Sequence, residues 1–396
     1  MKNCVFTLVA LLALVARANE APPPYQPNAA IQYWRAFTEL AEIPAEARKP
    51  LSHAFNAARG KNRTELAARL SHILGLLNRG AKMSGADWGV DMAEGPNAEI
   101  PHAGKARELA RAALLAAREE FDNGRHGEGL AILFNVLALG RHISRDGTLI
   151  GRLVEVAINT MALDALNQEV QRLPREELEK IEMRFAALPP STPLSENVKS
   201  ERDMLEWFGA QRPNPEKAAI LKSLVSGDDK DDKAELLRLF NSPEAMEAAL
   251  RKLPPVYVEI ESALAVPHSE FDVAWNKVNA AAANAGVLAR WTRNSFVTLR
   301  STLDRNDLQF ALTRAGIRIA LEGEKAVPTL RDPFGDGPLA YAKLPNGFQL
   351  TSVLIHNEKP TKALFGEAAR KLPPPDLAPN PTEAIRPPAP PNPGDF

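Results

Sequence analysis

The sequence predicts a mainly α-helical protein made of stacked αα-hairpins, with a small β-hairpin near its C-terminal end. Three observations carry this prediction. Hydrophobic residues make up 45% of the chain, enough for a large core, whereas aromatic residues make up only 6%. Ala, Leu, Glu and Arg are plentiful and favour helices, while the β-branched residues that favour strands are comparatively scarce. Apolar side chains also recur at helical spacing through residues 28–325, which we assign to one or more helical domains.

The helical pattern begins at Asn28, and prolines and glycines divide it into segments. Apolar residues at helical spacing indicate helices before Gly80 and over roughly residues 102–122, 149–173 and 289–322. Successive helices are joined by short connections, as in αα-hairpins, but we find no repeat of fixed period. A helical-repeat-like superhelix and an irregular bundle both fit this pattern.

Residues 1–18 have the order of a secretory signal peptide. Lys2 precedes the apolar run 5–15, and a small-x-small cleavage site ends at Ala18. We therefore expect cleavage near Ala18 and a periplasmic or secreted location. An uncleaved membrane anchor is the alternative, although the run is short for a membrane span. Cys4 is the sole cysteine and precedes the run, so we expect neither a lipid anchor nor a disulfide in the mature chain.

Charge and motif content exclude several classes of function. The formal net charge is −1 and basic residues are scattered among acidic ones, which argues against a nucleic-acid partner. No segment after residue 20 predicts a transmembrane helix. The chain has no Gly-x-Ser-x-Gly motif, phosphate-binding loop or dinucleotide glycine pattern, and its seven histidines lack a metal-binding spacing. We therefore expect no cofactor and no metal.

The character of the sequence changes near residue 331. Two short apolar runs, residues 339–343 and 348–355, flank Asn346-Gly347, which is a strong signal for a β-hairpin. A last helix over residues 361–372 is expected to complete a hairpin module covering 326–372. Two Pro-rich segments lie outside the folded part: a linker at 19–27 and a disordered tail at 373–396, which holds ten prolines.

Several short motifs stand out along the chain: Asp87-Trp88, Ile100-Pro101-His102, Leu139-Gly140-Arg141-His142, Arg331-Asp332-Pro333-Phe334 and Gly337-Pro338-Leu339. Together they resemble a group of large exported bacterial proteins that are mainly helical and end in an Asp-Pro-Phe hairpin module. The resemblance spans much of residues 28–356. It implies export and a helical fold, and it carries over no activity.

The Asp332-Pro333 turn is also similar to a turn in the C-terminal part of type II secretion pseudopilins, where it leads into a small sheet with an Asp-rich calcium loop. The present chain departs from that pattern. Residues 353–362 read VLIHNEKPTK, without a cluster of Asp or Gly, and the pilin-type N-terminal apolar helix with its Glu is missing. We therefore expect a shared local hairpin, and neither a pilin function nor a calcium site.

The long connection over residues 80–101 is the best candidate for a functional site, because most helix connections are much shorter. It contains Trp88, Asp91 and Glu94 and leads directly into His102. A carboxylate near a histidine suits acid–base catalysis or metal binding, and Trp88 suits stacking on a sugar or peptide ring. The alternative interpretation places Trp88 in the core, the acids in water and His102 in a first helical turn.

Arg141 and His142, which we place at a helix end, complete the set of candidate binding residues. In the alternative interpretation they only complement the helix dipole. Two functions follow from the sequence. The first is an exported helical scaffold or interaction protein of the cell envelope, without chemistry of its own and with an envelope protein as its partner. The second is a hydrolase with its site around loop 85–102.

Overall fold

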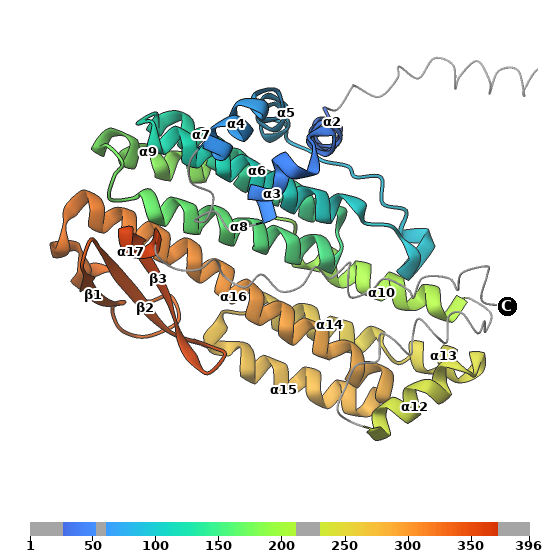
Figure 1. The fold of residues 1–396 in the computed structure, drawn as a ribbon. Coiled ribbons are helices and arrows are strands. Elements are labelled where there is room, and N and C mark those ends of the chain that lie inside the picture. The colour runs from blue at the N-terminus through green and yellow to red at the C-terminus, as the bar shows by residue number, and fades with distance from the viewer. Residues whose placement is uncertain (1–26, 53–60, 211–229, 371–396) are drawn as a thin grey trace, which may run out of the picture.

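The computed structural model describes residues 27–52, 61–210 and 230–370, and it confirms a mainly helical protein with a small C-terminal sheet (Figure 1). The predicted signal peptide, nearly all of the linker and the Pro-rich tail lie outside these residues. Among the described helices, none is both long and apolar enough to cross a membrane.

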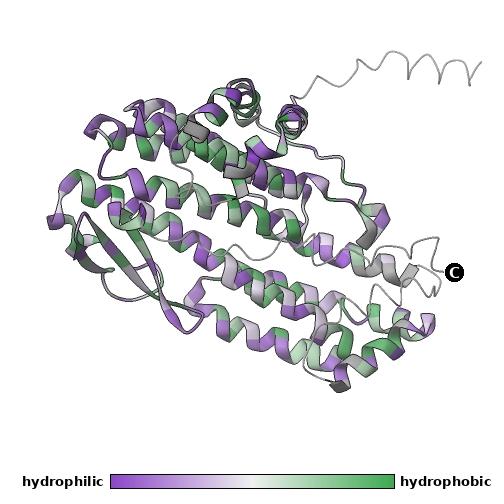
Figure 2. Ribbon diagram, in the orientation of Figure 1, coloured by the Kyte–Doolittle hydropathy of each residue, from purple (hydrophilic) through white to green (hydrophobic). Residues whose placement is uncertain are grey.

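The N-terminal helices pack side by side on one face of the molecule. Asn28 caps the first of them, because its side-chain oxygen accepts a hydrogen bond from the backbone N–H of Ala30. Most helices of the protein carry both hydrophobic and hydrophilic residues (Figure 2), so each buries one face in a shared core. These helices are α2 (Ala29–Glu42), α3 (Ala45–Ser52), α4 (Lys61–Arg69) and α5 (Ser71–Ala81).

Four helices joined by short connections form the centre of the molecule: the first three pack in sequence on one another, and the fourth packs on the second. Two of them, α7 (His126–Ile143) and α8 (Leu149–Glu169), are buried on several sides, and apolar residues occupy nearly the whole circumference of each helix. That pattern is typical of a helix enclosed by other helices. The four are α6 (Pro101–Asp122), α7 (His126–Ile143), α8 (Leu149–Glu169) and α9 (Arg175–Ala186).

The following helices build a second, smaller hydrophobic core. Prolines at the first turn begin α13 and α14, where a missing N–H costs no helical hydrogen bond. The set consists of α10 (Leu194–Ala210), α12 (Lys230–Phe240), α13 (Pro243–Leu250), α14 (Pro254–Ala265), α15 (His268–Ala285) and α16 (Val287–Glu322).

Helix α16 connects the two cores and decides the architecture. Leu299 and Leu303 lie in the second core, while Leu308 and Leu312, further along the same helix, lie in the first. α16 packs on α15, its predecessor in the chain, and also on α8, which is distant in sequence (Figure 1). The spatial order of the helices therefore departs from their chain order. This describes an irregular bundle and not a regular superhelix.

The C-terminal sheet has three antiparallel strands in the order β1-β2-β3, namely β1 (Ala340–Leu344), β2 (Gly347–His356) and β3 (Lys359–Gly366). The first two confirm the predicted hairpin around Asn346-Gly347. The predicted last helix over 361–372 is shorter than expected: residues 361–366 belong to β3, α17 covers Glu367–Arg370, and residues 371–372 lie outside the described part of the chain.

The third strand forms because of contacts that the local sequence does not reveal. Asn357 and Glu358 both adopt positive φ, which closes a tight turn and returns the chain alongside β2. Phe365 then stacks on Phe348 with ring centroids 4.6 Å apart. Phe365 also lies directly against α16, where a Cβ on Gly316 would collide with the phenyl ring. Pairing with β2 and packing on α16 thus make this short segment a strand.

The Asp-Pro-Phe segment holds the sheet in shape. One carboxylate oxygen of Asp332 accepts hydrogen bonds from the Ser352 hydroxyl at 2.8 Å and from the Phe334 N–H at 3.0 Å. The other accepts from the Val353 N–H at 2.8 Å. The pairing of β2 with β3 is irregular between Thr351 and Ile355, so the carboxylate supplies a partner that the strand ladder does not.

A buried carboxylate attaches the C-terminal module to the helical body. Glu169, at the end of α8, is fully buried and pairs with Arg370 of α17. It also pairs with Arg172 at 2.9 Å and with Arg118 of α6 at 3.5 Å. A buried charge needs such partners because the interior hydrates it poorly. The contact fixes α17 on α6 and α8.

Candidate functional site

Trp88 lies in the core and anchors the long connection between α5 and α6. Its indole N–H donates a hydrogen bond of 2.7 Å to the backbone carbonyl of His142. Its ring stacks on the imidazole of His102, with centroids 4.6 Å apart, and on Phe37. The ring faces of Trp88 are therefore occupied by protein side chains. This arrangement corresponds to the structural interpretation of Trp88.

His102 is buried in the first turn of α6 and bonded to a carboxylate. Its Nε2 lies 2.9 Å from Asp146 Oδ2, and the two side chains are only 1% and 0% exposed. Asp146 also accepts hydrogen bonds from the Thr148 N–H and hydroxyl, and Thr148 caps α8. A Cβ on Gly151 would collide with this carboxylate, so glycine is needed there. The group ties the starts of α6 and α8 together.

His142 forms a second buried polar pair. Its Nδ1 lies 2.8 Å from the hydroxyl of Tyr33. Burial and, to a smaller extent, the positive charge of Arg145 together lower the pKa of His142 to about 4, while a backbone hydrogen bond with Met83 acts in the opposite direction. Burial also raises the pKa of the Tyr33 hydroxyl. Both groups are therefore neutral near neutral pH, as a buried hydrogen-bonded pair requires.

The two acids of the predicted site lie at the surface. Asp91 and Glu94 are exposed, at the start of the 3₁₀ segment η1 (Met92–Asn97). The segment packs on α10, where the indole of Trp207 lies against Gly95. Glycine fits this position because it has a positive φ and a Cβ would collide with the ring. The structure thus separates these carboxylates from the buried His102.

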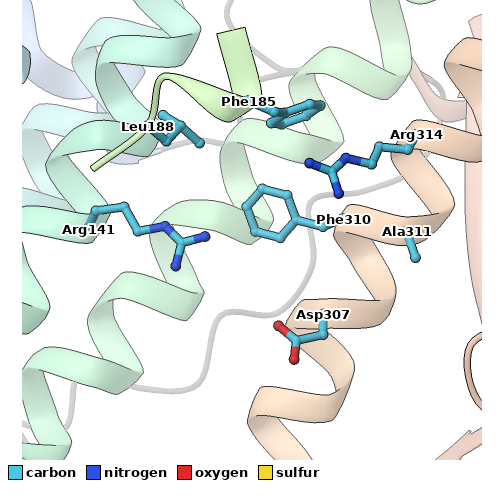
Figure 3. Close-up of a pocket in the computed structure, with 7 residues that line it drawn as sticks. All are labelled: Arg141, Phe185, Leu188, Asp307, Phe310, Ala311 and Arg314. Atoms are coloured by element: carbon cyan, nitrogen blue, oxygen red, sulfur yellow. The ribbon is translucent and has the colours of Figure 1, made fainter. Parts of the chain in front are cut away.

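Of the predicted site residues, Arg141 lines the pocket that the structure describes. The pocket has a volume of about 300 Å³ and lies between the end of α7, the end of α9 and the middle of α16 (Figure 3). Four apolar and three charged residues line it. They are Arg141, Phe185, Leu188, Asp307, Phe310, Ala311 and Arg314.

Two aromatic rings form one wall of the pocket, and each carries a guanidinium group. Phe185 and Phe310 meet edge to face with centroids 5.7 Å apart. Arg141 lies 5.6 Å from the centroid of Phe310, and Arg314 lies 5.1 Å from that of Phe185. Figure 3 shows the two guanidinium groups approaching Phe310 from opposite sides. Stacking on a ring favours one orientation of a planar guanidinium and leaves its edge N–H groups available.

A buried carboxylate behind the pocket holds Arg141 in place. Glu155 of α8 is 1% exposed and pairs with Arg141 at 3.1 Å and with Arg152 at 2.6 Å. The Nε of Arg141 is buried and has no hydrogen-bond partner among the described residues. Arg314, in contrast, is half exposed and its Nε lies 3.3 Å from the exposed Glu182. One arginine is therefore held by a buried carboxylate, and the other lies exposed at the rim.

Asp307 is the acidic group of the pocket. It is open to solvent there, yet surrounding protein removes part of its hydration, and this burial raises its pKa. Its hydrogen bond with Asn306 and the charges of Arg152 and Arg141 act in the opposite direction, while Asp304 adds to the increase. With Asp307 ionised, two arginines and one aspartate give the lining a formal charge of +1.

Most of the pocket escaped the sequence-based prediction. Asp307, Phe310, Ala311 and Arg314 follow one another at spacings of three, one and three residues, which places them on one face of a helix. The sequence therefore already placed an aromatic ring and two opposite charges on one helix face. It did not reveal that this face lies next to α7, because α7 and α16 are more than 140 residues apart in the chain.

Within the described residues, no three or more His, Cys, Asp or Glu side chains gather in a way that could hold a metal ion. Comparisons with protein-family models, curated proteins and solved structures gave no match. The resemblance to exported helical proteins therefore stays a prediction, and the function has to be argued from the site itself.

Proposed function

We propose that the protein is an exported helical scaffold of the cell envelope that binds a partner without chemistry of its own. The signal-peptide pattern of residues 1–18 supports export. The pocket between α7, α9 and α16 supports binding, and we propose that it holds an acidic group of the partner.

One observation carries the proposal. Arg141 and Arg314 both line the pocket, each guanidinium lies beside a phenyl ring, and Arg314 is half exposed there. Arginine in this setting is a preorganised donor for carboxylates, since its fork can form two parallel hydrogen bonds. Aromatic residues and arginine are also the residue types that dominate binding energy at protein interfaces.

The alternative, a hydrolase centred on loop 85–102, has less support from the geometry. Its candidate acid–base residue, His102, is 1% exposed, and the Nε2 atom already bonds Asp146. The ring is covered by Trp88. A general base must reach the proton that it removes. Substrate screening with a His102→Asn variant would test this alternative directly.

The test is affinity capture of the tagged full-length protein from its native envelope fraction, with quantitative mass spectrometry. We expect a partner at near one-to-one stoichiometry that is lost with Arg314→Ala. The matched control is Arg318→Ala, because Arg318 lies one turn further along α16, is equally exposed and pairs with Glu322 outside the pocket. A partner captured equally by both variants, or no stoichiometric partner, would overturn the proposal.

A further inference from the structure

We infer that the pocket holds the C-terminal residue of the partner chain, with its α-carboxylate on Arg141 and Arg314 and an apolar side chain on the phenyl wall. This inference rests on the proposed function and deepens it by naming the chemistry that is recognised. Three properties of the pocket lead to it: its charge, its wall and its size.

The charges of the pocket lining favour a ligand that carries a single negative charge. The two guanidinium groups attract an anion, but Asp307 lines the same pocket and repels one. A phosphate would bring close to two negative charges near that carboxylate. A carboxylate brings one, which matches the +1 lining. It also matches the planar fork of arginine.

The wall favours an apolar group next to that carboxylate. Phe185, Leu188, Phe310 and Ala311 supply the remaining lining. Phe185 is buried and packs edge to face on Phe134, so the wall is backed by the core. A carboxylate and an apolar side chain on adjacent atoms are the two features of a terminal residue such as Leu or Phe.

Asp307 accounts for a third group of such a residue. A chain-terminal residue carries a backbone N–H, and an ionised carboxylate is a pure hydrogen-bond acceptor. Asp307 therefore complements the amide N–H while the arginines complement the carboxylate. A ligand with a carboxylate alone would place its negative charge near Asp307 without offering that carboxylate a hydrogen-bond donor.

The size points to one residue of a longer chain. Pockets for small molecules measure about 300–1,000 Å³ and enclose most of their ligand. At about 300 Å³ this pocket is at the lower limit. It also opens to solvent beside Asp307 and Arg314, both of which are exposed. One residue fits inside, and the chain that precedes it can leave through this opening.

The experiment measures binding of N-acetylated pentapeptides ending in Leu to the full-length protein, by fluorescence anisotropy of a labelled probe. We expect the free-acid peptide to bind at least about tenfold more tightly than its C-terminal amide, since the amide loses charge-assisted hydrogen bonds. Arg314→Ala should reduce affinity for the acid by about tenfold, while Arg318→Ala leaves it unchanged. Circular dichroism checks that each variant is folded.

A second arm isolates Asp307. N-methylation of the last amide removes the N–H that Asp307 is inferred to accept. Asp307→Ala should therefore weaken binding of the ordinary peptide severalfold relative to its effect on the methylated peptide, for which the variant only removes a repulsive charge.

Two results would overturn the inference. Equal affinity for acid and amide would remove the carboxylate from recognition, and free leucine binding as tightly as the peptide would make the ligand an amino acid. Failure of every peptide, with an envelope partner still lost in Arg314→Ala, would sink this inference and leave the proposed function standing. If Arg314→Ala changes neither peptide binding nor partner capture, both fail.

Discussion

Arg141 and His142 are neighbours in the chain, but they belong to two polar regions of opposite character. Successive residues of a helix point about 100° apart, so α7 presents one side chain to each region. His142 faces the buried region, where its Nδ1 bonds Tyr33, its carbonyl accepts from Trp88, and His102 bonds Asp146. Arg141 faces the pocket, which it lines together with the exposed Asp307 and Arg314.

The difference shows that burial distinguishes polar groups that stabilise the fold from polar groups that can bind a ligand. A buried polar group has to be paired within the protein, or the fold loses free energy. Once paired, as in the contact between His102 and Asp146, it has little capacity left for a ligand. Asp307 and Arg314 of the pocket are open to water, so they can exchange water for a ligand at small cost to the fold.

The strongest test of this comparison is removal of the anchor. Trp88→Ala should lower the free energy of unfolding by about 3–5 kcal/mol, because it leaves a large cavity and an unpaired carbonyl on His142. Glu94→Ala, in the same connection but exposed, should stay within about 0.5 kcal/mol. Urea unfolding followed by circular dichroism measures both. Similar effects from the two changes would contradict the assignment of Trp88 as an anchor.

A pH series sharpens the comparison at His142. The pKa is lowered from 6.5 to about 4 on folding, so between these values the unfolded state binds more protons than the folded state. Stability from this group is present above pH 6.5 and is lost as pH falls towards 4. At about 1.4 kcal/mol per pKa unit the loss is about 3 kcal/mol.

The measurement compares the wild type with His142→Gln, which does not titrate in this range. The difference in unfolding free energy between the two proteins should shrink by about 3 kcal/mol as pH falls from 7.5 to 4. Parallel curves over this window would show that His142 titrates normally and is not buried as a neutral group.

The smallest effects on stability are expected in the pocket. Arg141→Ala removes one of two partners of the buried Glu155 and should cost about 1–2 kcal/mol. Arg314→Ala affects an exposed pair and should cost less than about 0.5 kcal/mol. Urea unfolding measures these values. If Arg314→Ala destabilises the fold as much as Arg141→Ala, then Arg314 is a structural residue and not an exposed hydrogen-bond donor for a ligand.

Much of the fold could be predicted because its signals are local. The spacing of apolar residues indicated the helices, and Asn346-Gly347 indicated the hairpin that β1 and β2 form. The third strand was not predicted, and the reason is physical. Residues 361–366 have no strong pattern of their own, and they become a strand only because β2 offers a free edge and Gly316 leaves room for Phe365.

For the candidate site, too, the local signals could be read from the sequence and the tertiary contacts could not. The sequence drew attention to Trp88, Asp91, Glu94, His102, Arg141 and His142 as residues with chemical capacity. It could not show that Trp88 and His102 cover each other, because stacking depends on the relative position of α6 and the preceding connection. Nor could it pair Arg141 with Asp307 and Arg314.

By itself, then, the sequence determined the helical class, the positions of the main helices and the β1–β2 hairpin, since periodicity and turn chemistry act within a few residues. Tertiary structure decided which polar groups are buried and paired within the protein and which line the open pocket. That depends on the return of α16 beside α7 and α8, a contact between segments far apart in the chain. Burial is a property of the packed molecule, and here burial separates the anchor from the pocket.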